Sequence, residues 1–221
     1  MRVFPLIAAA LVLSGIHTAQ TAESSEALSY VPEIAREAAA EGNAAFLRKD
    51  YVRARRAYTK VLDLAPDNLV ALTNLGMVEF ADGHFDDAEK FLKSAVRLRL
   101  ENAPAWLTLG MVYMDQGRLD EALAALSQAT AQDPRNPRAR NYLGVVIGRK
   151  GWLDGAQSEL RHAVEIDPSY SDAHFNLAYF YLERKPPLYE LARRHYFRSI
   201  ELGAPPDKDI EEALRKSEEK R

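Results

Sequence analysis

The sequence predicts an all-α protein, a right-handed superhelical solenoid of five helix-turn-helix repeats followed by a C-terminal capping helix. Each repeat contains two apolar segments with helical spacing, separated by a turn. The repeats also share a register of small residues with a period of 34, and a fixed period of this length indicates a solenoid. The members of that register are Gly42, Gly76, Gly110, Gly144 and Ala178.

The N-terminal segment 1–22 has the features of a secretory signal peptide. Arg2 supplies a positive start, an apolar run covers 3–13, and small residues ending at Ala22 offer a cleavage site. The apolar run is shorter than the roughly 20 residues that span a bilayer. We therefore expect an exported protein, periplasmic or extracellular, with no membrane span after cleavage. The alternative is an uncleaved anchor or a buried first helix.

Composition excludes several classes of function. The chain has 221 residues and a net charge of −3, with both signs interspersed, so it has no electrostatic footprint for nucleic acid. It contains no cysteine, which excludes disulfides, thiolate metal sites and a cysteine nucleophile.

The predicted solenoid occupies 32–205 and follows a polar linker at 23–31. The second repeat has Leu100 where a closing proline is expected, so we expect its second helix to run on slightly. The fifth repeat has two inserted residues around Pro186, which lengthen its turn. The repeats cover about 35–68, 69–102, 103–136, 137–170 and 171–204.

Turn residues support each helix pair. A glycine follows several of the first helices, as expected for a left-handed C-terminal cap. An aspartate suited to opening a helix comes three residues after each glycine. The glycines are Gly83, Gly117 and Gly151, and the aspartates are Asp86, Asp120 and Asp154.

Small residues are expected to set the helix packing, because the distance between two helices depends on the side chains at their crossing. Glycine on the first helix and alanine on the second let the two helices of a repeat approach closely. The predicted pairs are Gly76 with Ala88, Gly110 with Ala122, and Gly144 with Ala156.

The segment 206–221 is predicted to form one more helix. Acidic residues such as Asp207 crowd its start, and Arg215 and Lys216 come later, which is the order that the helix dipole favours. Its narrow apolar stripe, which includes Ile210 and Leu214, suits a helix that covers the last repeat. The alternative is a helix that binds a partner.

The spacing within 103–134 resembles the tetratricopeptide repeat family. The residues that carry the resemblance are Trp106, Leu109, Gly110, Tyr113, Ala122, Leu126, Ala129 and Pro134. The resemblance extends over about 35–204. It implies that the first helices of successive repeats line a concave groove, which holds extended or helical peptides.

When the repeats are aligned by this register, the resemblance implies which residues line the groove. Among them, asparagines could bond both groups of a peptide backbone, methionines could form an apolar floor, and aromatic residues could act as anchors. The alternative is that the methionines and aromatics are ordinary core. The predicted partner-binding residues are Asn43, Asn74, Met77, Thr108, Met111, Arg138, Asn141, Tyr142, Val145, Arg149, Phe175, Asn176 and Tyr179.

One family subtype grips acidic C-termini of chaperones with paired asparagines and several basic residues. Asn43 and Asn74 match the asparagines, but Ala39, Pro104 and Thr108 stand where the basic residues belong. This clamp is therefore not expected.

No catalytic, metal-binding or cofactor motif is found. The five histidines show no metal-ligand spacing, and there is no Gly-rich phosphate loop or G-x-S-x-G sequence. His174 falls at an interior helix position, whereas His162 and His195 are expected at the surface. We therefore predict a protein that is not an enzyme and needs neither metal nor cofactor.

The predicted function is a protein–protein interaction scaffold or adaptor. It would bind a peptide or a partner helix in its groove, in an envelope assembly, secretion or trafficking complex. The alternative is a structural module that self-associates as a homo-oligomer and has no peptide ligand.

Overall fold

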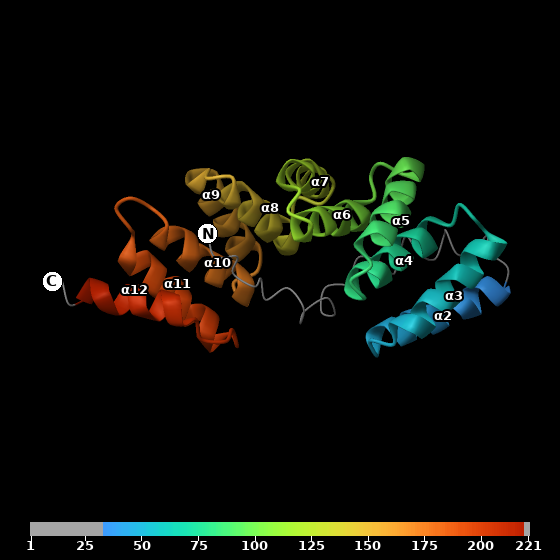
Figure 1. Cartoon of the computed structure of the whole chain (residues 1–221), viewed down its shortest axis with the longest axis horizontal. Coiled ribbons are helices and arrows are strands. Elements are labelled where there is room, and N and C mark those ends of the chain that lie inside the picture. The colour runs from blue at the N-terminus through green and yellow to red at the C-terminus, as the bar shows by residue number, and fades with distance from the viewer. Residues whose placement is uncertain (1–32, 219–221) are drawn as a thin grey trace. The chain divides into compact units, whose positions relative to one another are not determined.

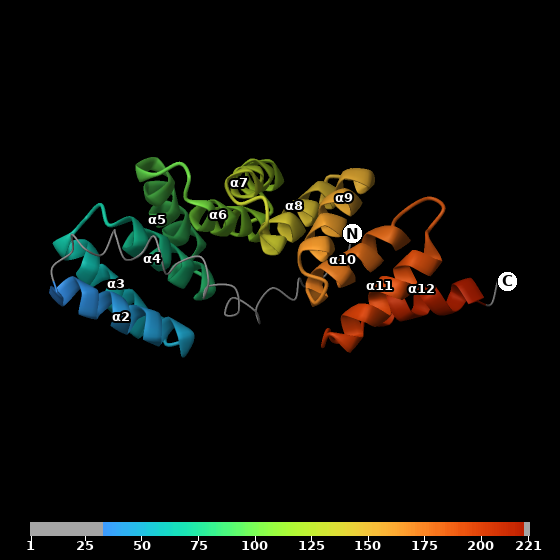
Figure 2. The same cartoon turned by 180° about the vertical axis from the view of Figure 1, so that it is seen from behind.

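The structure is a computed structural model that describes residues 33–218, so the predicted signal segment and linker lie outside the described residues. The described part of the chain consists of helices and their connections, without strands (Figures 1 and 2). In chain order the helices are α2 (Glu33–Leu47), α3 (Tyr51–Leu64), α4 (Leu69–Ala81), α5 (Phe85–Leu98), α6 (Ala103–Asp115), α7 (Leu119–Gln132), α8 (Pro137–Arg149), α9 (Leu153–Ile166), α10 (Ser171–Leu182), α11 (Tyr189–Glu201) and α12 (Lys208–Glu218).

The chain divides into two compact units, Met1–Leu100 and Glu101–Arg221. The described part of unit 1 contains α2 to α5, and that of unit 2 contains α6 to α12. Within each unit, the two helices of a repeat pack against each other, and each pair packs against the next. The predicted all-α helix-pair fold is confirmed.

The second helices recur at the predicted spacing. The helices α3, α5, α7 and α9 each have 14 residues, and their first residues, Tyr51, Phe85, Leu119 and Leu153, are evenly spaced by one repeat. The expectation that the second helix of repeat 2 runs on is wrong. Its last residue is Leu98, and Arg99 leaves the helix with an extended backbone (φ −144°, ψ 111°).

Helix capping differs from the prediction. The side chains of Asn68, Asn102 and Asn136 cap α4, α6 and α8 by accepting backbone N–H bonds. The aspartates expected to open α5, α7 and α9 instead lie inside the first turn of these helices. There they interact favourably with the helix dipole, but they are not capping residues.

The turns within repeats use left-handed backbone geometry, as predicted. Gly83, Gly117 and Gly151 have φ values of 83°, 75° and 88°. In repeat 1 the same register holds Lys49, which adopts φ 58° although it has a side chain. A residue other than glycine is strained in this region.

The two helices of a repeat approach closely at the glycine register, as predicted, but the nearest side chain is not the predicted alanine. A Cβ atom built on Gly110 would lie 2.5 Å from Leu126, and one built on Gly42 would lie 2.8 Å from Tyr58. Gly76 and Gly144 face Leu92 and Leu160 in the same way. Each glycine therefore makes room for a large side chain on the second helix of its own repeat.

The predicted capping helix is confirmed as α12, which contacts α10 and α11. Its apolar residues Ile210 and Leu214 are buried. The Tyr196 hydroxyl accepts the Asp207 N–H at 2.8 Å and lies 3.0 Å from the Glu211 carboxylate. The helix α12 therefore covers the end of the last repeat.

Candidate functional site

The first helices of unit 2 form a continuous layer. The helix α8 contacts both α6 and α10. The second helices α7 and α9 both pack on one side of this layer (Figure 1). We call the side of α8 and α10 that carries Arg138, Phe175 and Asn176 the inner face.

Two asparagines link α8 and α10 at the inner face. The Asn176 Nδ2 donates to the Asn141 Oδ1 at 2.9 Å, and the Asn141 Nδ2 lies 3.5 Å from the Tyr170 hydroxyl. Asn141 is buried, whereas Asn176 is half-buried. Both polar groups of Asn141 therefore take part in internal contacts, and Asn176 keeps its carbonyl oxygen and one N–H for other partners.

Tyr170 occupies the register of the capping asparagines Asn68, Asn102 and Asn136. It makes no side-chain capping bond to α10, and its hydroxyl lies instead beside Asn141. Burial raises the pKa of Tyr170, so the hydroxyl stays protonated and supports the asparagine pair.

Charged groups of both signs lie beside this pair. Burial raises the pKa of Asp172, and the nearby Arg138 partly offsets this shift. Burial also raises the pKa of Tyr142, again with Arg138 acting in the opposite direction. Arg138 and Asp172 thus present one charged group of each sign on this part of the inner face.

Burial divides the predicted partner-binding residues into two groups. One group is buried and contributes to packing, in line with the core alternative: Asn74, Thr108, Met111, Asn141, Tyr142 and Val145. The other group is exposed or half-buried: Asn43, Met77, Arg138, Arg149, Phe175, Asn176 and Tyr179. The structure therefore brings the accessible polar and aromatic candidates together chiefly on α8 and α10.

Unit 1 contains a second asparagine pair. The Asn43 Oδ1 accepts the Tyr58 hydroxyl at 2.5 Å and the Asn74 Nδ2 at 3.3 Å. Burial raises the pKa of Tyr58, which keeps this donor protonated. Asn43 and Asn74 therefore connect α2, α3 and α4.

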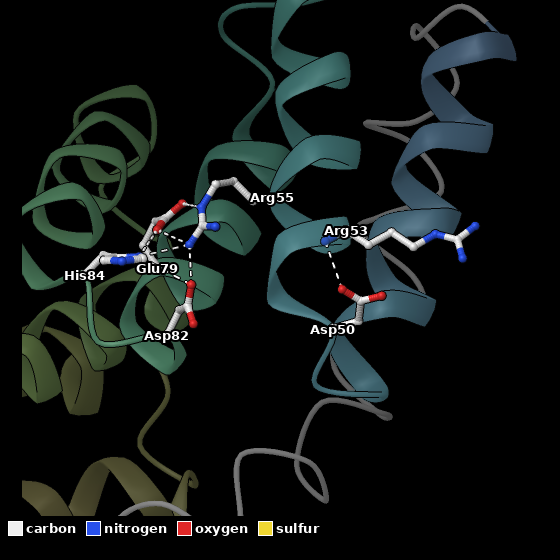
Figure 3. A network of polar contacts seen from close by, with 6 residues as sticks. All are labelled: Asp50, Arg53, Arg55, Glu79, Asp82 and His84. Carbon is white, nitrogen blue, oxygen red and sulfur yellow. Dashed lines mark hydrogen bonds and ion pairs between the residues drawn. The ribbon is translucent and has the colours of Figure 1, made fainter.

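A charged network joins the two repeats of unit 1 (Figure 3). Arg55 of α3 binds the Glu79 carboxylate with Nε at 2.5 Å and Nη2 at 2.8 Å, and its Nη2 also lies 2.5 Å from Asp82. The His84 Nδ1 lies 3.0 Å from Glu79. The Glu79 side chain is only 4% exposed, so the network neutralises a buried charge. No local sequence pattern predicts this network, because 24 residues separate Arg55 from Glu79.

Two histidines meet between α10 and α11. Their Nδ1 atoms lie 2.9 Å apart, and the His174 Nε2 lies 3.2 Å from the Pro168 carbonyl oxygen. Because a carbonyl oxygen can only accept, neutral His174 donates through Nε2 and accepts the Nδ1–H of His195. His174 is buried as predicted. The surface position expected for His195 is wrong, because its ring is half-buried between His174 and Tyr181.

Burial lowers the pKa of His174, and it lowers the pKa of His195 to about 4. Within residues 33–218 no group of three or more histidine or carboxylate side chains could hold a metal ion. No described helix has the length and apolar character needed to cross a membrane.

The packing of consecutive helix pairs defines a helical-repeat protein. One matching family model is described as the Cilia and flagella-associated protein 70 C-terminal domain and covers residues 7–167. Another is described as Tetratricopeptide repeat and covers 159–201. The chain therefore belongs to the tetratricopeptide repeat family. No curated protein sequence matches it significantly.

Several solved structures share the fold. A crystal structure of MamA is 26% identical with a TM-score of 0.65, and the match covers 77% of this chain and 92% of MamA. YrrB is 24% identical with a TM-score of 0.64, and the match covers 88% of this chain and 97% of YrrB. PilF of Pseudomonas aeruginosa is 19% identical with a TM-score of 0.71, covering 79% and 78% of the two chains.

Proposed function

We propose that this chain is a non-enzymatic protein-interaction scaffold that binds an extended peptide or a partner helix on the inner face of unit 2. The observation that carries this proposal is the Asn141–Asn176 pair at 2.9 Å. One asparagine is buried and holds the other, whose remaining amide groups lie at the surface.

The amide of Asn176 suits a peptide backbone. Its carbonyl oxygen accepts a backbone N–H, and its second N–H donates to a backbone carbonyl. The bond to buried Asn141 orients the Asn176 side chain before a ligand arrives, which lowers the entropy lost on binding. Such contacts bind the main chain irrespective of the ligand's sequence.

Aromatic side chains next to Asn176 supply the apolar contacts. Phe175 and Tyr179 are half-buried and lie one helical turn apart on α10, so they share one side of the helix. Partly exposed aromatic residues concentrate binding energy at interfaces. Arg138 adds a charged hydrogen-bond donor at that end.

Similar folds support a binding role. YrrB is described as a TPR protein with an unusual peptide-binding site, so this fold can hold a peptide. The cellular setting that we propose is export, with a partner in an envelope assembly, secretion or trafficking complex. The sequence pattern of residues 1–22 supports this setting.

Site-specific photo-crosslinking in the native envelope tests the proposal. A benzoylphenylalanine at position 175 should capture a partner protein. The control places benzoylphenylalanine at position 161 instead, where it replaces Arg161, an exposed residue of α9. Asn176→Ala should weaken capture from position 175 without changing the helical circular dichroism. Asn141→Ala is less informative, because Asn141 is buried and its loss affects folding.

Equal capture from both positions, or capture that Asn176→Ala leaves unchanged, would contradict the proposal. Crosslinking of the chain to a second copy of itself from position 175 would instead favour the self-associating alternative.

A further inference from the structure

Three departures from the repeat pattern meet at one shallow pocket in unit 2. The pocket lies between the start of α9 and the turn that joins α10 to α11, and its volume is about 370 Å³. Its lining includes Trp152, Asp154, Gly155, Arg184 and Lys185. We call it the Trp152 pocket.

The first departure is an exposed tryptophan. Trp152 is 55% exposed, and the Lys150 ammonium lies 5.3 Å from the centre of its ring. The equivalent positions of the three preceding repeats hold the polar residues Asp50, His84 and Arg118. A large apolar side chain at this position is therefore not required by the fold.

The second departure is the absence of a side chain at Gly155, within α9. The equivalent positions of the preceding repeats hold Arg53, Asp87 and Glu121. A Cβ atom on Gly155 would meet only Ile147 at 3.1 Å within 4 Å. Because Gly155 lines the pocket, a longer side chain there would occupy part of the pocket, and glycine leaves it open.

The third departure is the lengthened turn of repeat 5, which brings two basic residues to the pocket. Arg184 forms an ion pair with Asp154 and donates to the Gln157 Oε1 at 3.2 Å. Lys185 is exposed and forms no ion pair within the described residues. Arg184 and Lys185, which precede the prolines of this turn, thus supply one wall of the pocket.

The charges around the pocket favour an anionic ligand. Asp154 balances Arg184, and Asp120 balances Lys150 through an ion pair. Lys185 has no balancing carboxylate among the lining residues, so the pocket has one uncompensated positive charge. Since the chain as a whole carries −3, this local charge does not extend to a surface suited to a long polyanion.

We propose that the Trp152 pocket binds an acidic segment of a partner protein. An apolar side chain of that segment packs on the Trp152 indole, and a neighbouring carboxylate pairs with Lys185. Tryptophan is among the residues that dominate interface energies, and a nearby cation adds charge selectivity. This site lies at the turn edge of repeats 4 and 5, and it shares no residue with the Asn141–Asn176 pair.

Tryptophan fluorescence measures occupancy directly. The chain has two tryptophans, so a Trp106→Phe background leaves Trp152 as the reporter. The probe is a synthetic peptide that repeats Glu-Leu-Gly, and its counterpart carries lysine in place of each glutamate. The acidic peptide should shift the Trp152 emission in a saturable way that added salt weakens, whereas the lysine peptide should not.

Two variants localise the response. Gly155→Glu introduces the residue of repeat 3 and should weaken the acidic peptide about tenfold, as read by calorimetry with both native tryptophans present. Glu121→Gly, the reciprocal change in repeat 3, should leave the affinity unchanged. Asn176→Ala should also leave it unchanged, so failure of this proposal is separable from failure of the inner-face proposal.

Several results would overturn the assignment. These are no saturable response to the acidic peptide, an equal response to the lysine peptide, or unchanged affinity in Gly155→Glu. A response to phosphatidylglycerol vesicles but not to the peptide would assign the pocket to a membrane surface. An emission change that follows protein concentration, with dimer formation in sedimentation, would assign it to a second copy of the chain.

Discussion

The guanidinium of Arg55 in α3 donates two hydrogen bonds, of 2.5 and 2.8 Å, to the buried carboxylate of Glu79 in α4. In the third and fourth repeats the equivalent positions hold Leu123 and Ile147. Unit 1 thus has an ion pair where unit 2 has two apolar residues, and the fold accepts both.

This comparison predicts the effect of removing one partner or both. Arg55→Leu should lower the free energy of unfolding by about 3–5 kcal/mol, because it leaves Glu79 charged and buried. Arg55→Leu combined with Glu79→Ile reproduces the apolar pair of unit 2 and should recover most of that loss. Urea unfolding at neutral pH measures both. A double variant as unstable as the single one would show that the ion pair has no apolar equivalent here.

Replacing Lys49 by glycine should stabilise the protein. Its φ of 58° costs about 1–2 kcal/mol for a residue with a side chain. Glycine removes this strain, but its greater conformational freedom in the unfolded chain offsets part of the gain in stability. Lys49→Gly should therefore raise the free energy of unfolding by about 0.5–1 kcal/mol. Gly117→Ala, in the same register, should lower it by a similar amount. Changes of the same sign in the two variants would contradict the shared turn geometry.

Gly110 should not tolerate even one added carbon. A Cβ there would lie 2.5 Å from the Leu126 side chain, so Gly110→Ala should cost about 1–3 kcal/mol in a thermal or urea melt. Leu126→Ala removes the clashing group, and the double variant should be less destabilised than the sum of the two single changes. Simple additivity would mean that the clash is relieved elsewhere.

The histidine pair predicts a loss of stability in acid. The pKa of His195 is about 4 in the folded chain, below the usual value of 6.5, so the unfolded chain binds more protons between these two values. Stability should therefore fall as the pH drops from about 6.5 to about 4. His195→Phe keeps a ring beside Tyr181 and should flatten this part of the profile. The difference between the profiles isolates the pair from the carboxylates, and identical slopes would rule out its role.

The helix pairs were predictable because their causes are local. The apolar spacing of each helix and the small residue at each crossing recur once per repeat, and the turn glycine recurs in repeats 2 to 4 as Gly83, Gly117 and Gly151. The asparagine caps recur at the same period and could have been recognised. The pairing of Gly110 with Leu126 was only partly predicted, because the sequence does not say which large side chain a glycine admits.

The candidate site was less predictable, because the register specifies the helix face on which a residue lies but not how deeply its side chain is buried. The register predicts Met111 and Phe175 in the same groove, yet Met111 is 3% exposed and Phe175 is half-buried. Likewise, 35 residues separate Asn141 from Asn176, and no local signal links them. Packing between repeats decided which of these side chains remain accessible.

By itself, the sequence determined the class of fold, the period, the position of each helix pair and the presence of a capping helix. These follow from interactions between residues close in the chain. Only the tertiary structure decided that Asn141 holds Asn176, that Arg55 neutralises Glu79 and that His195 meets His174. Each of these contacts joins residues on different helices, and its strength depends on burial, which arises only when the repeats pack together.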